Sequence, residues 1–559
     1  MRIVLPRASR GFVFTRLFTI EMNDFDVERL LPSLFYLIIT RGRQRGKKGN
    51  DPTAFDKYVE ELAHHPRVQG FGTPEGRRLL GQWVRTSLVR LGKIGRGKRG
   101  EQIEFVVPFT LLTYKMGFPA EIRRQRNVHV FLYQIFERLL SNLDAKPDPS
   151  GALAALFAHV FGRGVAIGAA PEYNGEYDGK TDVDLHELLC LCYLDGFHPV
   201  EASKKEAPLA YGPSLPWVAR EMARHLLLYI IAYQDRMPKI ALTRGLMALI
   251  NFKLFIYTLK LIYAVNSLVK ENNLPPAMRD QGSVSPPELY VDFARVRNAL
   301  SDEMARACVE RDLEELRAFF ESAMLLRTID RFAEGQSELK ERLTGRGMPA
   351  CLHSLLGLRG DPNIKADARA EIRSIREETL NSCLESDKVD VQAEIEELKR
   401  QSPGSDLDHV VRLLVEAQRS KAVDNYVAWF GSVGGLRKSF GLLAGNPRGR
   451  RNWRYAMSDD LLGTLVQLAL IEDPTGRLEH PRIRTQLRLR DFLAFLEHRF
   501  GIVVDRPPGF LSSAIARAAA SENLEALRRR LRQMGFFQAL SDDFTAQYLR
   551  SQQSTEVAL

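Results

Sequence analysis

Residues 246–269 (LMALINFKLFIYTLKLIYAVNSLV) constrain the fold most, because a stretch this apolar has to leave water. The stretch is long enough to span a bilayer, but it contains Lys253 and Lys260, and charges at a bilayer centre are costly. The two lysines lie seven residues apart and share one helical face, which we expect to meet solvent or a partner. The sequence therefore predicts a buried core helix and no membrane contact.

Helical periodicity dominates the rest of the chain. Apolar residues recur every three or four positions in 301–345, and 365–400 has the charged composition of an exposed helical segment. Alternating strand patterns are few, the best being the first ten residues and 101–109 (EQIEFVVPF). We expect a mainly α, multidomain helical protein with a few short strands.

Joints rich in proline and glycine divide the chain. They lie at 146–151, 272–276, 283–287, 400–406 and 505–509. The division predicts four parts: a basic domain (1–146), a helical domain with the buried apolar helix (147–275), a charged helical domain (276–402) and an arginine-rich C-terminal domain (403–559). The five cysteines form no CxxC motif, and the basic start lacks the apolar block of a signal peptide, so we expect a cytoplasmic protein.

Positive charge is concentrated at the two ends. Residues 1–150 contain 26 basic and 15 acidic residues, and 441–559 contain 17 basic residues, all arginine, and 13 acidic ones. The chain as a whole has a net charge of +10, so 151–440 is mildly acidic. This distribution favours a polyanionic partner at the ends and protein partners in the middle.

Two glycine-flanked loops carry the N-terminal charge. RGRQRGKKG (41–49) has no apolar position to bury, and LGKIGRGKRG (91–100) places its cations among four glycines. We expect exposed loops whose cations and backbone N–H groups approach phosphates. Neither fits the P-loop, which requires a hydroxyl where Arg99 follows Lys98. The alternative is solvated loops without a ligand. The candidate contacts are Arg41, Arg43, Arg45, Lys47, Lys48, Arg96, Lys98 and Arg99.

The C-terminal segment supplies a second candidate. GNPRGRRNWRY (445–455) adds the candidate contacts Arg448, Arg450 and Arg451 around Trp453, which either stacks on a base or anchors a domain. Ser458 is expected to cap a helix, a short helix from about 491 to 499 should end at Gly501, and 502–505 should be extended. A last helix is expected from Ser521 to Gly535, with its arginines mostly outside an apolar stripe. Short helices with brief extended pieces are compatible with a winged-helix-like module, although such a helix face could also be solvated or bind protein.

One cluster suggests chemistry. Residues 172–198 (EYNGEYDGKTDVDLHELLCLCYLDGFH) contain carboxylates that could hold Mg²⁺ for phosphodiester cleavage, and His186 and Cys190 would share a helical face in a metal site. The leucines around Cys190 favour a buried helix after a polar loop instead. We therefore assign no catalytic residue, no metal site and no cofactor, and keep a metal-dependent nuclease using the carboxylates of 172–187 as an alternative.

Three C-terminal runs carry a resemblance: YAMSDDLLGTLVQLALI, LRDFLAFLEHRFGIVVD and LRRRLRQMGFFQALSDDFTAQYLR. These roughly 110 residues resemble modules in large accessory subunits of bacterial anti-phage systems, of the methylation-associated or phosphorothioation-dependent restriction type. The resemblance implies a DNA-sensing subunit working beside separate enzymes. We expect a non-catalytic nucleic-acid-binding subunit, for DNA or else RNA, with other subunits of a defence complex as partners. The remaining alternative is a protein-interaction scaffold without nucleic-acid contact.

Overall fold

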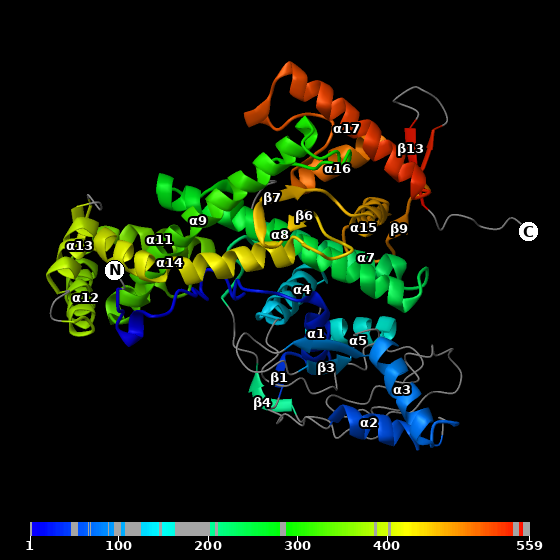
Figure 1. The fold of residues 1–559 in the computed structure, drawn as a ribbon, viewed down its shortest axis with the longest axis horizontal. Helices are drawn as coiled ribbons and strands as arrows, with labels where there is room; N and C mark the ends of the chain where they lie inside the picture. Colours follow the sequence, from blue (N-terminus) through cyan, green and yellow to red (C-terminus); the bar gives the residue numbers. More distant parts are fainter. Residues whose placement is uncertain are drawn as a thin grey trace, which may run out of the picture.

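Helices dominate the computed structural model, which confirms the predicted mainly α class (Figure 1). The structure describes residues 3–45, 54–64, 66, 69–87, 89–93, 102–106, 125–144, 148–161, 202–206, 211–279, 287–384, 388–400, 404–539 and 547–551. The helices are α1 (Val27–Ile39), α2 (Ala54–Ala63), α3 (Pro74–Ser87), α4 (Val128–Asp144), α5 (Pro149–Phe161), α7 (Pro216–Tyr233), α8 (Lys239–Glu271), α9 (Leu300–Glu334), α10 (Ser337–Leu343), α11 (Met348–Gly357), α12 (Pro362–Asn381), α13 (Lys388–Arg400), α14 (Asp406–Val433), α15 (Asp459–Ala469), α16 (Leu489–Phe500) and α17 (Ala514–Gln533).

The strands are short and pair mostly in twos. They are β1 (Arg43–Arg45), β2 (Val89–Lys93), β3 (Gln102–Val106), β4 (Ala202–Glu206), β5 (Leu289–Tyr290), β6 (Leu443–Asn446), β7 (Gly449–Tyr455), β8 (Ile471–Glu472), β9 (Arg482–Ile483), β10 (Gln486–Arg488), β11 (Ile502–Val503), β12 (Phe537–Ala539) and β13 (Gln547–Arg550). The antiparallel pairs are β1–β4, β2–β3, β6–β7 and β8–β9, and β5–β11 is parallel. The one three-stranded sheet in the described residues has the order β10-β13-β12.

The apolar stretch of 246–269 lies within α8, as the sequence predicts. Among the described residues α8 alone is long and apolar enough to cross a membrane, and 94% of its apolar window is buried inside the protein. It runs through the middle of the molecule beside α7, with α1, α4 and α5 on one side and α16 and α17 on the other (Figure 1). The expectation that Lys253 meets solvent or a partner is wrong. Its side chain is only 5% exposed and is buried under α7 and α16.

One continuous cluster of buried apolar side chains extends from Ile3 to Leu549. α9 is its longest member and packs against α8, α14 and β7, which come from well-separated parts of the sequence. α14 continues to the end of the molecule formed by α11, α12 and α13 (Figure 1). The four-domain division stays a prediction.

Several local predictions were right. The helices expected over 301–345 and 365–400 are present as α9 with α10 and as α12 with α13, and 101–109 contains β3. Gly501 ends α16 with a φ of 73°, the left-handed conformation that glycine adopts readily, and β11 follows it.

Three other local predictions were wrong. Within the expected N-terminal strand, the described residues 3–10 are not a strand, because Ile3 and Leu5 are buried in the core without a strand partner and Arg7–Ser9 forms a short 3-10 helix. Part of the expected loop 41–49 is β1, since β4 provides a pairing edge distant in sequence. Ser521 does not cap the last helix: Ser513 Oγ accepts the capping bond from Ala516 N at 3.1 Å, so α17 begins at Ala514.

Candidate nucleic-acid interface

The structure describes only some of the N-terminal residues that we expect to contact nucleic acid. Arg41 is exposed and its Nη1 lies 3.1 Å from Asp148 Oδ2, with both side chains more than half exposed. Arg43 is exposed and faces Glu206 across the β1–β4 pair, and Arg45 ends β1. An exposed ion pair contributes little, so Asp148 does not prevent Arg41 from meeting a phosphate. Lys47, Lys48, Arg96, Lys98 and Arg99 lie outside the described residues.

The segment with Arg448, Arg450 and Arg451 forms a hairpin. β6 and β7 pair from Leu443–Tyr455 to Asn446–Gly449, which leaves Pro447 and Arg448 in the turn. The three candidate arginines are exposed, and Arg450 Nη2 lies 3.1 Å from Asp424 Oδ1. The hairpin thus presents three arginines to solvent, one of them paired with an exposed carboxylate on α14.

Trp453 and Arg454 fix the hairpin to the protein. Trp453 is 3% exposed, and its Nε1 donates to Asn446 O at 2.8 Å while its ring lies parallel to that of Phe430. Arg454 Nε lies 3.0 Å from the buried Asp302 Oδ1 on α9. Trp453 is therefore the anchor that one of the two sequence interpretations expects, and it is not available for stacking on a base.

A second group of arginines surrounds the three-stranded sheet. Leu487, Leu549 and Phe537 face the core, whereas Arg488 and Arg550 are exposed on the opposite face. α16 packs against β10 and β13, and α17 packs against β12. An ion pair between Arg530 of α17 and Asp459 in the first turn of α15 joins these two helices.

The C-terminal arginines divide into two kinds. Seven form ion pairs within the protein: Arg450, Arg454, Arg484, Arg499, Arg506, Arg528 and Arg530. Ten are exposed and have no ion pair with the described residues: Arg448, Arg451, Arg477, Arg482, Arg488, Arg490, Arg517, Arg529, Arg532 and Arg550. Only two of the ten were among the predicted contacts. Of the other eight, Arg482, Arg488 and Arg490 lie in RIRTQLRLR (482–490), whose spacing could have indicated them. The sequence does not show that Arg484, in the same run, is paired with Glu472.

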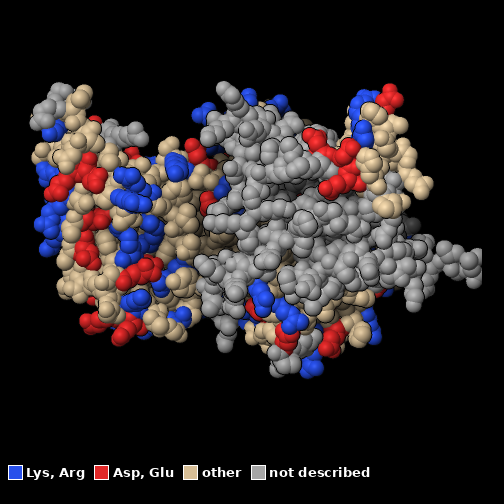
Figure 2. Space-filling view, turned by 90° about the horizontal axis from the view of Figure 1, so that it is seen from below, with Lys and Arg blue, Asp and Glu red and all other residues tan. Residues whose placement is uncertain are grey.

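The opposite end of the molecule has a mixed surface. Seen from below, Lys and Arg side chains alternate with Asp and Glu over α12 and α13 (Figure 2). Ion pairs such as Arg369–Asp406 and Arg359–Asp408 use many of these charges. On the face that Figure 2 shows, basic and acidic side chains lie beside one another at this end of the molecule.

No group of three His, Cys, Asp or Glu side chains that could hold a metal ion occurs in the described part of the chain. The acidic cluster of 172–198, on which the nuclease alternative depends, lies outside that part.

A protein-family model described as methylation-associated defense system protein MAD7 matches residues 7–552. No curated protein and no solved structure matches the chain.

Proposed function

The chain belongs to the family of the methylation-associated defense system protein MAD7, and from this premise we propose that it is a DNA-binding, non-catalytic subunit of a defence complex. Membership confirms the resemblance to methylation-associated defence systems and extends it from the C-terminal 110 or so residues to nearly the whole chain. DNA contact, the absence of catalysis and a cytoplasmic location are our proposals.

The observation that carries the proposal is the order of elements in the C-terminal module, defined as α15 to β13. With the two-residue strands β8, β9 and β11 left aside, the order is α15, β10, α16, α17, β12 and β13, and the sheet order is β10-β13-β12. This order is compatible with the winged-helix-like module that we propose, in which α17 would be the helix presented to the DNA groove. The connection between β12 and β13, which would be the wing, has the acidic sequence LSDDFTA and does not favour phosphate contact.

The arginines of α17 support the same interface. Arg517, Arg529 and Arg532 are exposed without ion pairs to described residues. At about 100° per residue they lie within roughly one third of the helix circumference. Three guanidinium groups on one face, with Arg488 and Arg550 on the neighbouring sheet, match the phosphate contacts that supply sequence-independent affinity.

The test is a salt titration of duplex binding by the full chain. A fluorescent 30-base-pair duplex is titrated between about 50 and 300 mM NaCl, and the logarithm of the association constant is plotted against that of the salt concentration. Replacing Arg517, Arg529 and Arg532 with Gln should weaken binding and reduce the slope by about 0.9 for each phosphate that the variant no longer neutralises. A control with the same change in charge replaces Arg346, Arg373 and Arg400, which are exposed near α10 to α13.

The proposal is wrong if the wild type forms no complex at low salt, or if the control lowers the slope as much as the α17 variant. An RNA strand in parallel titrations distinguishes the two nucleic acids. Mg²⁺-dependent shortening of the duplex, abolished by Asp182→Ala with Asp184→Ala, would support the nuclease alternative instead.

A further inference from the structure

A small basic pocket lies where α7, α8 and α16 meet. It is open to solvent and is bounded by apolar residues on the inner side. Its charged and aromatic lining residues are Trp217, Glu221, His225, Lys253, Lys260, His498, Arg499 and Phe500. The position is distinct from the exposed arginines of the proposed DNA interface.

Lys253 is the unusual residue of this pocket. Its Nζ contacts His225 Nδ1 and lies 4.3 Å from the centre of the Phe500 ring, and no described carboxylate lies within ion-pair distance. Burial lowers the pKa of this ammonium well below its usual range. Burying an amino group without an anionic partner costs stability, whether the group stays charged or is held neutral, so the position is not explained by folding alone.

Lys260 lines the same pocket two helical turns further along α8. It is half-buried and forms no hydrogen bond or ion pair with the described residues. Burial lowers its pKa to about 8, with Arg499 acting in the same direction against Glu221. Like Lys253, Lys260 is therefore an amino group of the pocket that has no anionic partner among the described residues.

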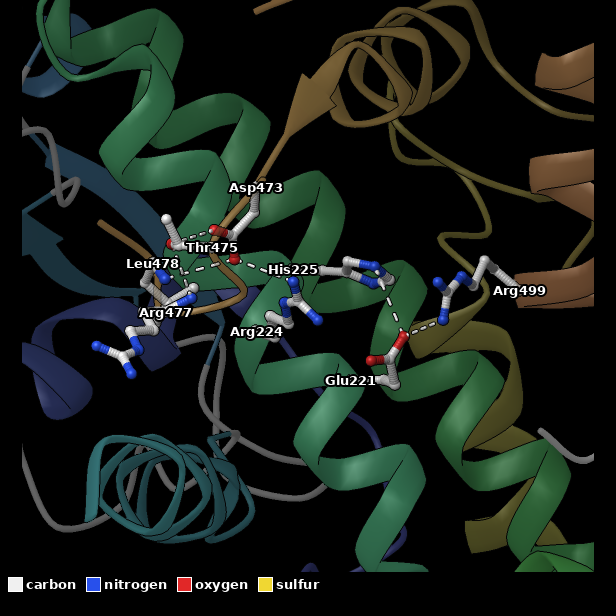
Figure 3. A network of polar contacts seen from close by, with 8 residues as sticks. All are labelled: Glu221, Arg224, His225, Asp473, Thr475, Arg477, Leu478 and Arg499. Carbon is white, nitrogen blue, oxygen red and sulfur yellow. Dashed lines mark hydrogen bonds and ion pairs between the residues drawn. The ribbon is translucent and has the colours of Figure 1, made fainter. Parts of the chain in front are cut away.

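The single carboxylate of the lining, Glu221, is already used. Figure 3 shows its side chain between His225 and Arg499, and its Oε2 forms an ion pair with Arg499 Nη1 and lies 3.9 Å from His225 Nε2. The neighbouring Arg224 pairs with Asp473 at 3.0 Å on another side of α7 and does not line the pocket. Because Glu221 is paired with Arg499, the lining offers no further carboxylate to the amino groups of Lys253 and Lys260.

We infer that this pocket binds a phosphate dianion, either inorganic phosphate or the phosphate of a small nucleotide. Two ammonium groups balance two negative charges, and the imidazole N–H of His498 can donate to a phosphate oxygen. Binding would return protons to the lysines, because an adjacent anion favours their charged form. Since α16 belongs to the C-terminal module and α7 and α8 to the core, the bound anion would join the two.

The first experiment measures heat of binding and thermal stability of the full chain in sodium phosphate and in NaCl of equal ionic strength. Phosphate should raise the melting temperature above the chloride value. Titration calorimetry in two buffers of different ionisation enthalpy should show proton uptake. AMP and ADP in separate arms distinguish the sources: binding tighter than that of phosphate identifies a nucleotide, with the half-buried Trp217 as the base platform.

Two variants make the test specific. Lys260→Gln should weaken phosphate binding at least tenfold, and Lys253→Met should abolish it while raising the melting temperature of the free protein. Lys270→Gln, an exposed position on the same helix, is the control and should bind as the wild type does.

The inference is overturned if phosphate and chloride act alike on the wild type, or if Lys260→Gln binds as tightly as Lys270→Gln. Neither lysine variant removes an arginine of the proposed DNA interface. An unchanged salt slope with duplex DNA therefore separates failure of this inference from failure of the proposed function.

Discussion

The hydroxyl of Tyr455 donates a hydrogen bond of 2.6 Å to the carboxylate of Asp312, which is fully buried in α9. Tyr263 of α8 donates to the same carboxylate at 2.6 Å, and Arg311 Nη2 lies 2.8 Å from it. Burial raises the pKa of Asp312, while Arg311 and the two tyrosines favour its charged form. One carboxylate thus holds together α8, α9 and the hairpin that carries Arg448 and Arg451.

Tyr455→Phe should therefore destabilise the protein without altering its shape. The change removes one of the bonds to a buried carboxylate, and hydrogen bonds to charged groups contribute about 1.5 to 3 kcal/mol. The free energy of unfolding from urea titration should fall by that amount. Tyr211→Phe is the matched control, because that ring is 45% exposed and its hydroxyl makes no hydrogen bond to described residues. Equal stability of the two variants would contradict the role of Asp312.

Gly435→Ala should be among the costly single changes. Gly435 has a φ of 72°, and a Cβ there would lie 2.5 Å from Gly441 Cα. This close approach lets Gly434 O accept from Leu442 N and Leu443 N, so that the chain returns to the C-terminal end of α14 (Val433) where β6 begins at Leu443. We expect the free energy of unfolding to fall by roughly 2 kcal/mol or more, seen as a lower melting temperature. Gly357→Ala in α11, where nothing lies within 4 Å of the new methyl group, should leave stability nearly unchanged or raise it.

Asp330 should make stability depend on pH. Burial raises the pKa of its carboxyl to about 6, with Glu334 adding to the rise and Arg16 opposing it. The folded state therefore binds more protons than the unfolded state between about pH 4 and pH 6, so stability falls as pH rises through this window. Between pH 4 and pH 7, the free energy of unfolding of the wild type should fall by roughly 2 to 3 kcal/mol more than that of Asp330→Asn. The measurement is the free energy of unfolding from urea titration at each pH. If it changes with pH in the same way for both proteins, Asp330 does not titrate in this window.

Features set by neighbouring residues could be predicted from the sequence. The apolar run predicted α8, Gly501 ends α16, and Ser458 Oγ accepts from Leu461 N as expected of a cap. These depend on interactions within one helical turn, which periodicity and capping residues report directly.

Features set by distant pairing could not be predicted. β1 depends on β4, and β13 inserts between β10 and β12, so neither is a property of its own residues. The exposure of Arg488 and the burial of Lys253 follow from strand register and from the approach of α16, respectively. The pattern of cations therefore indicated the candidate interface in outline but not which of its members are free to bind.

The last prediction concerns the hairpin. Arg448 and Arg451 are exposed and form no ion pair with described residues, so replacing both with Gln should leave the melting temperature unchanged. If both contact phosphates, the slope of duplex binding against salt should fall by about 2. Trp453→Phe gives the opposite pattern, because it removes the donor to Asn446 O and should lower stability while retaining the slope of the folded protein.

Combining the hairpin change with the α17 variant should give the sum of the two slope reductions if one duplex touches both surfaces. A combined reduction no larger than that of the α17 variant alone would place the hairpin outside the DNA interface.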